Sequence, residues 1–207
     1  MAVENHRDTS AELKHSLLFV GRLQERKRLD VALRAFAALV DRLPTDLVFD
    51  IIGDGEPLGS LKALADTLGM AARVRFHGAI TDDAVLERYF TTAYAYISPG
   101  PVGLSVLHSF AFGVPVLTLR DGYHGPEFHN LVDGENGLIV DDEAAFSDAL
   151  ARLVLEPGLA QRLGHAAYRL YADERSIDVM IDGFVKAIEG GGETGQGAAR
   201  VTKDRQA

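Results

Sequence analysis

Residues 95–117 read AYISPGPVGLSVLHSFAFGVPVL, and this stretch decides the fold class. A short apolar run over 95–97 stops at a Ser-Pro-Gly-Pro turn, and apolar residues with helical spacing follow over 104–112. Gly113 ends the helical pattern, and another apolar run covers 114–117. Strand, helix and strand in this order are typical of a parallel sheet with crossover helices.

The same alternation extends through the rest of the chain in both directions. Further strands are predicted over 17–20, 47–52, 74–76 and 137–140, and further helices over 29–43, 58–68, 83–90, 143–155, 157–172 and 176–189. About six such units with short, almost continuously apolar strands predict an α/β fold, a doubly wound, Rossmann-like parallel sheet covered on both faces. Ligands bind such sheets beyond the carboxyl ends of the strands, where the glycine-rich turns of this chain fall.

The domain boundaries follow from composition. Residues 1–14 are polar and lack apolar periodicity, so we expect a linker there, and 15–189 form the predicted domain. Residues 190–207 are glycine-rich and lack apolar periodicity, which predicts a disordered tail.

Charge and composition exclude several classes of protein. The formal net charge of −9 argues against a general nucleic-acid binder, which would carry an excess of basic residues. The absence of cysteine excludes disulfides, thiol catalysis and cysteine zinc sites. Because no apolar run approaches about 18–20 residues and the first residues do not resemble a secretory signal, we expect a cytoplasmic protein.

Gly21 and Arg22 end the first predicted strand, and Lys27 follows shortly after. A glycine at a strand end lets backbone approach a ligand, and two cations at the mouth of a parallel sheet suit a pyrophosphate. The alternative is a solvated basic cluster at a helix start, although cations there oppose the helix dipole. Gly53-Asp54-Gly55 departs from a dinucleotide-binding fingerprint and is more simply a sharp turn.

Two later segments also carry candidate site residues. Gly100, Gly103 and Leu104 form a loop–helix junction whose free backbone amides suit an anion. His108 lies one turn into that helix and either contacts a ligand or serves as a structural hydrogen-bonding group. Glu127, in a short helix after Pro126, either offsets the helix dipole or binds a sugar hydroxyl.

In order and spacing, these motifs resemble the C-terminal half of GT-B fold glycosyltransferases of family 4, or glycosyl transferases group 1. The resemblance covers about 17–184. It rests on FVGRL at 19–23, IIGDG at 51–55, RVRFHG at 73–78, GVPV at 113–116, PE at 126–127 and DGENGLIV at 133–140. The chain departs from the family where two glutamates usually stand, because Gly100 and His108 occupy those positions.

The resemblance implies retaining transfer of a sugar from a nucleotide-diphosphate sugar, without a metal or other cofactor. Arg22 and Lys27 would stabilise the leaving diphosphate, and Glu127 would orient the sugar. The remaining donor-binding positions would be Gly21, Gly53, Gly78, Ala79, Ile80, Gly100, Gly103, Leu104 and His108. Among these, backbone at 78–80 would meet the base, and His108 could bond the ribose.

The family also implies an N-terminal, acceptor-binding half of comparable size, which this sequence does not contain. The expected partners are therefore a nucleotide-sugar donor, a glycan or lipid-linked acceptor, and a missing domain or partner subunit that could bring the protein to the inner membrane. The last predicted helix would offer that half an apolar face formed by Ile177, Met180, Ile181 and Phe184. A non-catalytic nucleotide-sugar-binding module and a subunit of a split enzyme stay open. An NAD-dependent epimerase is disfavoured, because its glycine fingerprint and Tyr-x-x-x-Lys are absent.

Overall fold

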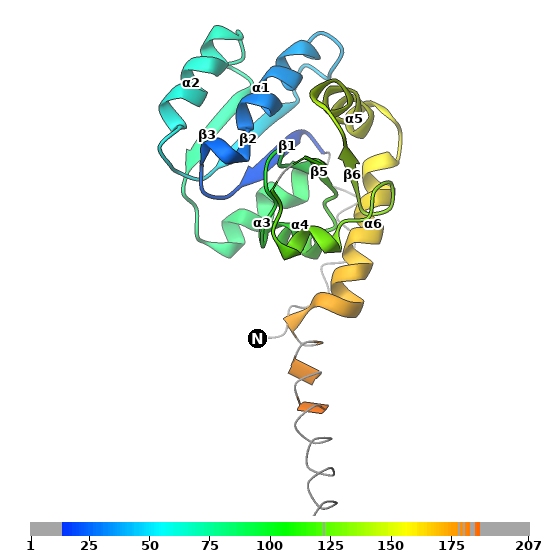
Figure 1. Cartoon of the computed structure of the whole chain (residues 1–207). Coiled ribbons are helices and arrows are strands. Elements are labelled where there is room, and N and C mark those ends of the chain that lie inside the picture. Colours follow the sequence, from blue (N-terminus) through cyan, green and yellow to red (C-terminus); the bar gives the residue numbers. More distant parts are fainter. Residues whose placement is uncertain (1–13, 122, 178, 180, 183–184, 187–207) are drawn as a thin grey trace, which may run out of the picture.

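The computed structural model describes residues 14–121, 123–177, 179, 181–182 and 185–186, and Figure 1 shows their arrangement. Its centre is a six-stranded sheet in the order β3-β2-β1-β4-β5-β6, in which every pairing is parallel. The strands are β1 (Ser16–Val20), β2 (Val48–Ile52), β3 (Val74–Gly78), β4 (Ala93–Ile97), β5 (Val116–Leu119) and β6 (Gly137–Val140). The predicted doubly wound parallel sheet is confirmed.

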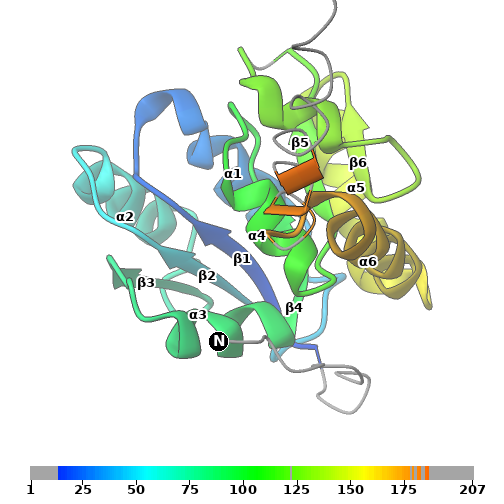
Figure 2. The same cartoon turned by 90° about the horizontal axis from the view of Figure 1, so that it is seen from below.

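Helices cover both faces of the sheet. On one face lie α1 (Leu29–Ala38), α2 (Leu58–Thr67) and α5 (Glu143–Leu155), and on the other α3 (Asp83–Thr92), α4 (Ser105–Ala111) and α6 (Leu159–Leu170) (Figures 1 and 2). The chain runs outward from β1 to β3 and then returns to β4, on the other side of β1. This reversal places a topological switch point between β1 and β4, the position where sheets of this kind bind ligands.

The central strands of the core carry apolar side chains on both faces of the sheet. Leu17, Leu18 and Phe19 of β1 are all 0% exposed, because helices cover the sheet above and below. Phe36 of α1 packs edge-to-face on Phe49 of β2, with ring centroids 6.2 Å apart. Continuous burial thus explains why these strands lack the alternation of polar and apolar residues that a half-exposed sheet shows.

Several helix ends lie where the sequence predicts them. The Asp82 carboxylate accepts a hydrogen bond from the Val85 amide at 3.1 Å and caps α3. The Ser176 hydroxyl accepts one from Val179 at the start of the last helix. Gly69 and Gly113 adopt left-handed φ values of 70° and 64° after α2 and α4, a backbone conformation that favours glycine.

Other boundaries differ from the prediction. The helix predicted over 29–43 ends at Ala38, and the apolar side chains that continue its spacing, Leu39 and Leu43, are buried in a turn instead. The strand predicted over 114–117 is shifted to Val116–Leu119. The reason is that Val114 completes the end of α4 by two hydrogen bonds with Ser109.

The C-terminal region has the same overall course as predicted. The helix predicted over 157–172 runs from Leu159 to Leu170 and continues as a π-helical turn, η4 (Tyr171–Arg175). The described residues of the predicted helix 176–189 are helical at 177, 179, 181–182 and 185–186. Lys14, the last residue of the predicted linker, donates a hydrogen bond to the Ala93 carbonyl at 2.7 Å. The rest of that linker and the predicted tail 190–207 lie outside the described residues.

A buried polar group interrupts the apolar surface between the sheet and α3. Asp50, in the middle of β2, is 3% exposed, and its Oδ1 lies 2.7 Å from Nε2 of His77 on β3. The other imidazole nitrogen, Nδ1, lies 3.3 Å from the Tyr89 hydroxyl on α3. A buried carboxylate is costly unless it is paired, so His77 satisfies Asp50 and also connects it to α3.

This arrangement predicts that the two members of the pair are not equivalent. His77→Leu leaves a buried carboxylate without its partner, and we expect it to lower the free energy of unfolding by about 3–5 kcal/mol. The double variant Asp50→Leu/His77→Leu removes the uncompensated carboxylate, so its free energy of unfolding should fall less than that of His77→Leu. Urea denaturation of the two variants and the wild type measures both values. A double variant as unstable as His77→Leu would contradict the assignment.

Candidate functional site

Three loops at the carboxyl edge of the sheet pack backbone against backbone. A side chain at Gly53 would place its Cβ 1.9 Å from the Gly21 carbonyl oxygen, and one at Gly55 would lie 1.9 Å from that of Leu23. On the other side, a Cβ at Gly100 would lie 2.0 Å from the Arg26 carbonyl oxygen. The loop that follows β1 therefore lies between two glycine turns that have no room for side chains.

Backbone hydrogen bonds fix this loop on both sides. The amides of Gly21 and Leu23 donate to the carbonyls of Ile52 and Asp54, each at 2.9 Å. The Gly100 amide donates to the Lys27 carbonyl at 3.0 Å. Main-chain contacts on both sides thus hold the residues between Gly21 and Lys27 at the switch point between β1 and β4.

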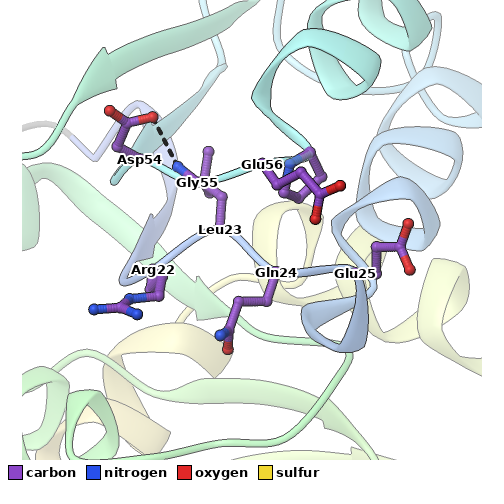
Figure 3. A pocket seen from close by; sticks show the side chains of 8 residues that line it. Arg22, Leu23, Gln24, Glu25, Asp54, Gly55 and Glu56 are labelled. Carbon is purple, nitrogen blue, oxygen red and sulfur yellow. Dashed lines mark hydrogen bonds between the residues drawn. The ribbon is translucent and has the colours of Figure 1, made fainter.

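Arg22 lines a pocket of about 560 Å³ between the loops after β1 and β2. The other lining residues are Leu23, Gln24, Glu25, Asp54, Gly55, Glu56 and Pro57. Figure 3 shows the Arg22 and Glu25 side chains at opposite ends of the loop. Across the part of the chain that the structure describes, no hydrogen bond or ion pair engages Arg22, so its guanidinium is available to a ligand.

Lys27 is directed to a different part of the rim. It ends the short 3₁₀-helix η2 (Glu25–Lys27), and its Nζ donates to the Pro101 carbonyl at 2.5 Å. Burial, followed by the positive charge of Arg26, lowers the pKa of Lys27, whereas the negative charge of Glu127 raises it. The loop after β1 therefore carries two cations in different places. Lys27 lies on the segment that follows β4, and Arg22 lines the pocket beside the loop after β2.

Glu127 lies in the segment that follows β5. It lies in η3 (Pro126–Asn130), and its Oε2 would be 2.6 Å from a Cβ at Gly125. The sequence proposes Lys27 and Glu127 for one site although 100 positions separate them, and the structure brings their charges within electrostatic range.

The candidate residues on α4 differ in their surroundings. Leu104 is 74% exposed at the start of α4, beside Gly103, whereas His108 faces the Phe90 and Phe112 rings at 4.9 and 5.5 Å. Burial lowers the pKa of His108, and the carboxylate of Asp83 raises it. The His108 imidazole is half-buried against these rings and makes no side-chain hydrogen bond to the part of the chain that the structure describes, so its contacts there are aromatic.

The turn after β3 also reaches this edge of the sheet. Gly78 has a left-handed φ of 71°, and its carbonyl accepts a hydrogen bond from the Gly53 amide at 2.7 Å. Ala79 is exposed and Ile80 half-buried, so both have surface to offer a ligand. The described residues contain no group of three His, Asp or Glu side chains arranged to hold a metal ion.

Sequence reasoning missed three residues that organise the site. Arg28, with an unusual left-handed φ of 52°, pairs with Asp121 at 3.1 Å and Glu143 at 2.9 Å, and so ties η2 to the ends of β5 and β6. His124 connects the loops after β4 and β5. Arg175 donates to Asn130 Oδ1 at 2.8 Å and joins η4 to η3. The left-handed conformation of Arg28 carried no signal in the sequence, and His124 lies just outside the quoted motif at 126–127.

The profile of the family described as Glycosyl transferases group 1 matches residues 4–170. The lipopolysaccharide core biosynthesis glycosyltransferase LpsE of Rhizobium meliloti is 31% identical over 83% of this chain. The chain belongs to the glycosyl transferases group 1 family. It spans about half the length of LpsE, 49%, so the match covers one part of that relative.

Solved structures share the fold of this family member. The pneumococcal O-GlcNAc transferase GtfA, crystallised with UDP and GlcNAc, has a TM-score of 0.74 at 19% identity, over 88% of this chain and 37% of its own. The C-terminal domain of a group 1 glycosyl transferase, LpcC of Francisella tularensis, has a TM-score of 0.68 at 20% identity, over 84% of this chain and 94% of its own. The resemblance inferred from the motifs is therefore confirmed, and the matched unit has the extent of one such C-terminal domain.

Within the family, the departure at position 100 has a physical explanation. A glutamate there would require space that the backbone of Arg26 and Lys27 already occupies. The glycine allows η2 to approach the loop after β4, and the same approach places the Lys27 ammonium on Pro101. A glycine at this position therefore supplies no carboxylate and leaves room for η2.

The two glycines of this loop should therefore respond differently to a methyl group. Gly100→Ala inserts a Cβ into the backbone of η2, and we expect the free energy of unfolding to fall by about 1–3 kcal/mol. Gly103→Ala is the matched control, since nothing lies within 4 Å of its Cβ, and it should change stability by less than about 0.5 kcal/mol. Chemical denaturation measures both, and equal losses would show that η2 is not packed as described.

Proposed function

We propose that this chain is the donor-binding half of a retaining glycosyltransferase, which transfers a sugar from a nucleotide-diphosphate sugar to an acceptor. The observation that supports it most is the position of Lys27 on the segment after β4, within electrostatic range of Glu127, in a chain that belongs to the group 1 family. Breaking the bond between the anomeric carbon and phosphate builds negative charge on the diphosphate, which fixed cations must stabilise.

Each proposed role follows from where the side chain lies. Lys27 would donate a hydrogen bond to the diphosphate from its place beside Pro101. The guanidinium of Arg22 would approach the diphosphate from the rim of the pocket. Glu127, as an anion next to that cation, would accept hydrogen bonds from sugar hydroxyls. Gly21, Gly53, Gly100 and Gly103 would let the backbone come close to the donor, and two side-chain cations would make a metal ion unnecessary.

The base and ribose would occupy the side of the site nearer β3. There, backbone at 78–80 follows directly after the strand, and His108 lies within electrostatic range of Asp83, at the start of the next helix. A UDP complex of the fold relative GtfA supports a nucleotide as the ligand class.

The acceptor would bind outside this unit. Relatives about twice as long leave room for an acceptor-binding half or partner subunit, and LpsE is named for lipopolysaccharide core biosynthesis, which supports a glycan or lipid-linked acceptor. The last helix offers apolar side chains for such a contact, since Ile177 is 64% and Ile181 54% exposed; Met180 and Phe184 lie outside the described residues. None of the helices formed by the described residues has the length and apolar composition to cross a bilayer.

A second candidate is a module that binds the nucleotide sugar without transferring it. Position 100 favours it, because a glycine supplies no carboxylate where the family usually has one. The two candidates agree on binding and differ on turnover, so donor hydrolysis or transfer separates them.

The proposal predicts that removing either cation weakens donor binding. Titration calorimetry with UDP and UDP-glucose, and with their GDP counterparts, should show Lys27→Ala and Arg22→Ala losing about 10–100-fold in affinity, since a hydrogen bond to a charged group contributes about 1.5–3 kcal/mol. Arg34→Ala is the matched control, because it removes an exposed positive charge from α1. Unchanged affinity in both site variants would refute the phosphate assignment.

A further inference from the structure

His124 makes two hydrogen bonds to backbone groups on opposite sides of its ring. Its Nδ1 accepts from the Val102 amide at 3.2 Å, and its Nε2 lies 2.8 Å from the Leu119 carbonyl oxygen. The ring also stacks on Phe128, with centroids 4.1 Å apart and planes inclined by 13°. One side chain therefore joins the loop after β4, the end of β5 and η3.

The partners dictate the state of the imidazole. An amide N–H can only donate and a carbonyl can only accept, so Nδ1 must carry a lone pair and Nε2 the proton. Protonation of Nδ1 would place two N–H donors against each other and break the contact with Val102. Burial, and to a lesser extent the nearby Lys27 ammonium, lower the pKa of His124, whereas the Leu119 carbonyl and Asp121 raise it.

The segment that His124 binds is also the segment that receives Lys27. The Lys27 ammonium donates to the Pro101 carbonyl, one residue before the Val102 amide. A Cβ at Gly125 would lie 2.6 Å from Glu127 Oε2 and 4.0 Å from the Val102 carbonyl oxygen, which places the Glu127 carboxylate beside the same segment.

We propose that neutral His124 is a positioning residue, which fixes the segment 100–103 against the turn that carries Glu127 and thereby sets the spacing between Lys27 and Glu127. Its importance for donor binding rests on the proposed function, but the contact itself does not. The charged groups around the ring are Lys27 from η2, Asp121 at the end of β5 with its partner Arg28, and Glu127 from η3.

Two substitutions separate positioning from packing. His124→Asn keeps an oxygen that can accept from the Val102 amide but does not titrate, whereas His124→Phe keeps the ring that stacks on Phe128 but has no acceptor. If the ring acts by hydrogen bonding, His124→Asn should retain the wild-type protection of the Val102 amide and the wild-type affinity for UDP-glucose, and His124→Phe should lose both. If it acts only by packing, the order should be reversed.

The first readout needs no ligand. The protection factor of the Val102 amide, which is the exchange rate measured by NMR after correction for the intrinsic pH dependence of exchange, should be high in the wild type at pH 7. It should fall as the pH drops below the ordinary imidazole value of about 6.5, because the folded-state pKa is lowered and the unprotonated form predominates above it. In His124→Asn the protection should persist at low pH, and in His124→Phe it should be absent at pH 7. Equal protection in all three proteins, or a wild-type imidazole protonated on Nδ1 at pH 7, would overturn the proposal.

The second readout uses UDP-glucose as a probe. His124→Phe should raise its dissociation constant about 3–10-fold at pH 7, the equivalent of one hydrogen bond, with His124→Asn close to the wild type. Lowering the pH to 5.5 should weaken binding by the wild type more than by His124→Asn. Altered amide exchange without any UDP-glucose binding in the wild type would retain the positioning role and refute the proposed function, whereas wild-type binding by His124→Phe would refute positioning.

Discussion

The contact on which the site depends is the packing of one loop, Gly21–Lys27, between two turns that have glycine at the points of contact. Gly53 and Gly55 on one side and Gly100 on the other allow main chain to lie on main chain, and hydrogen bonds from Gly21, Leu23 and Gly100 fix the register. Main-chain contacts of this kind fix the backbone that carries the cations at both ends of the loop, and the Lys27 ammonium is held further by the Pro101 carbonyl. The acidic balance of the chain, with a net charge of −9, makes the placement of these few cations decisive for binding an anion.

The site combines a cation, Lys27, and an anion, Glu127, which come from distant parts of the chain. Neutral hydrogen-bonding groups, the Pro101 carbonyl and His124, hold the segments around them. Lys27 is partly buried and rests on a carbonyl, Glu127 approaches from η3, and His124 spans the segments between them. Arg28 adds ion pairs to Asp121 and Glu143 at the surface, where such pairs contribute little to stability but can fix an orientation. A diphosphate and a sugar would meet complementary charges within one small region of the sheet edge.

Much of the fold could be predicted from the sequence, because buried parallel strands leave apolar runs and helix ends leave caps. Helix ends close to the predicted bounds are marked by Asp82, Ser176, Gly69 and Gly113. In contrast, the predicted helix 29–43 ends early, and its apolar residues Leu39 and Leu43 are buried in a turn. Motif order placed Lys27 and Glu127 in one site. The Asp50–His77 pair, the contacts of His124 and the left-handed Arg28 could not be predicted, because they depend on which side chains meet after the crossovers have folded. The roles of the candidate residues in donor binding stay predictions.

The π-helical turn at the end of α6 has a mechanical consequence. Arg175 in that turn donates to the Asn130 side chain, and the Asn130 amide in turn donates to the Glu127 carbonyl at 3.0 Å. Two consecutive hydrogen bonds thus link the turn that precedes the last helix to the backbone of Glu127. A partner that contacted this helix would therefore act, through these two hydrogen bonds, on the backbone at Glu127.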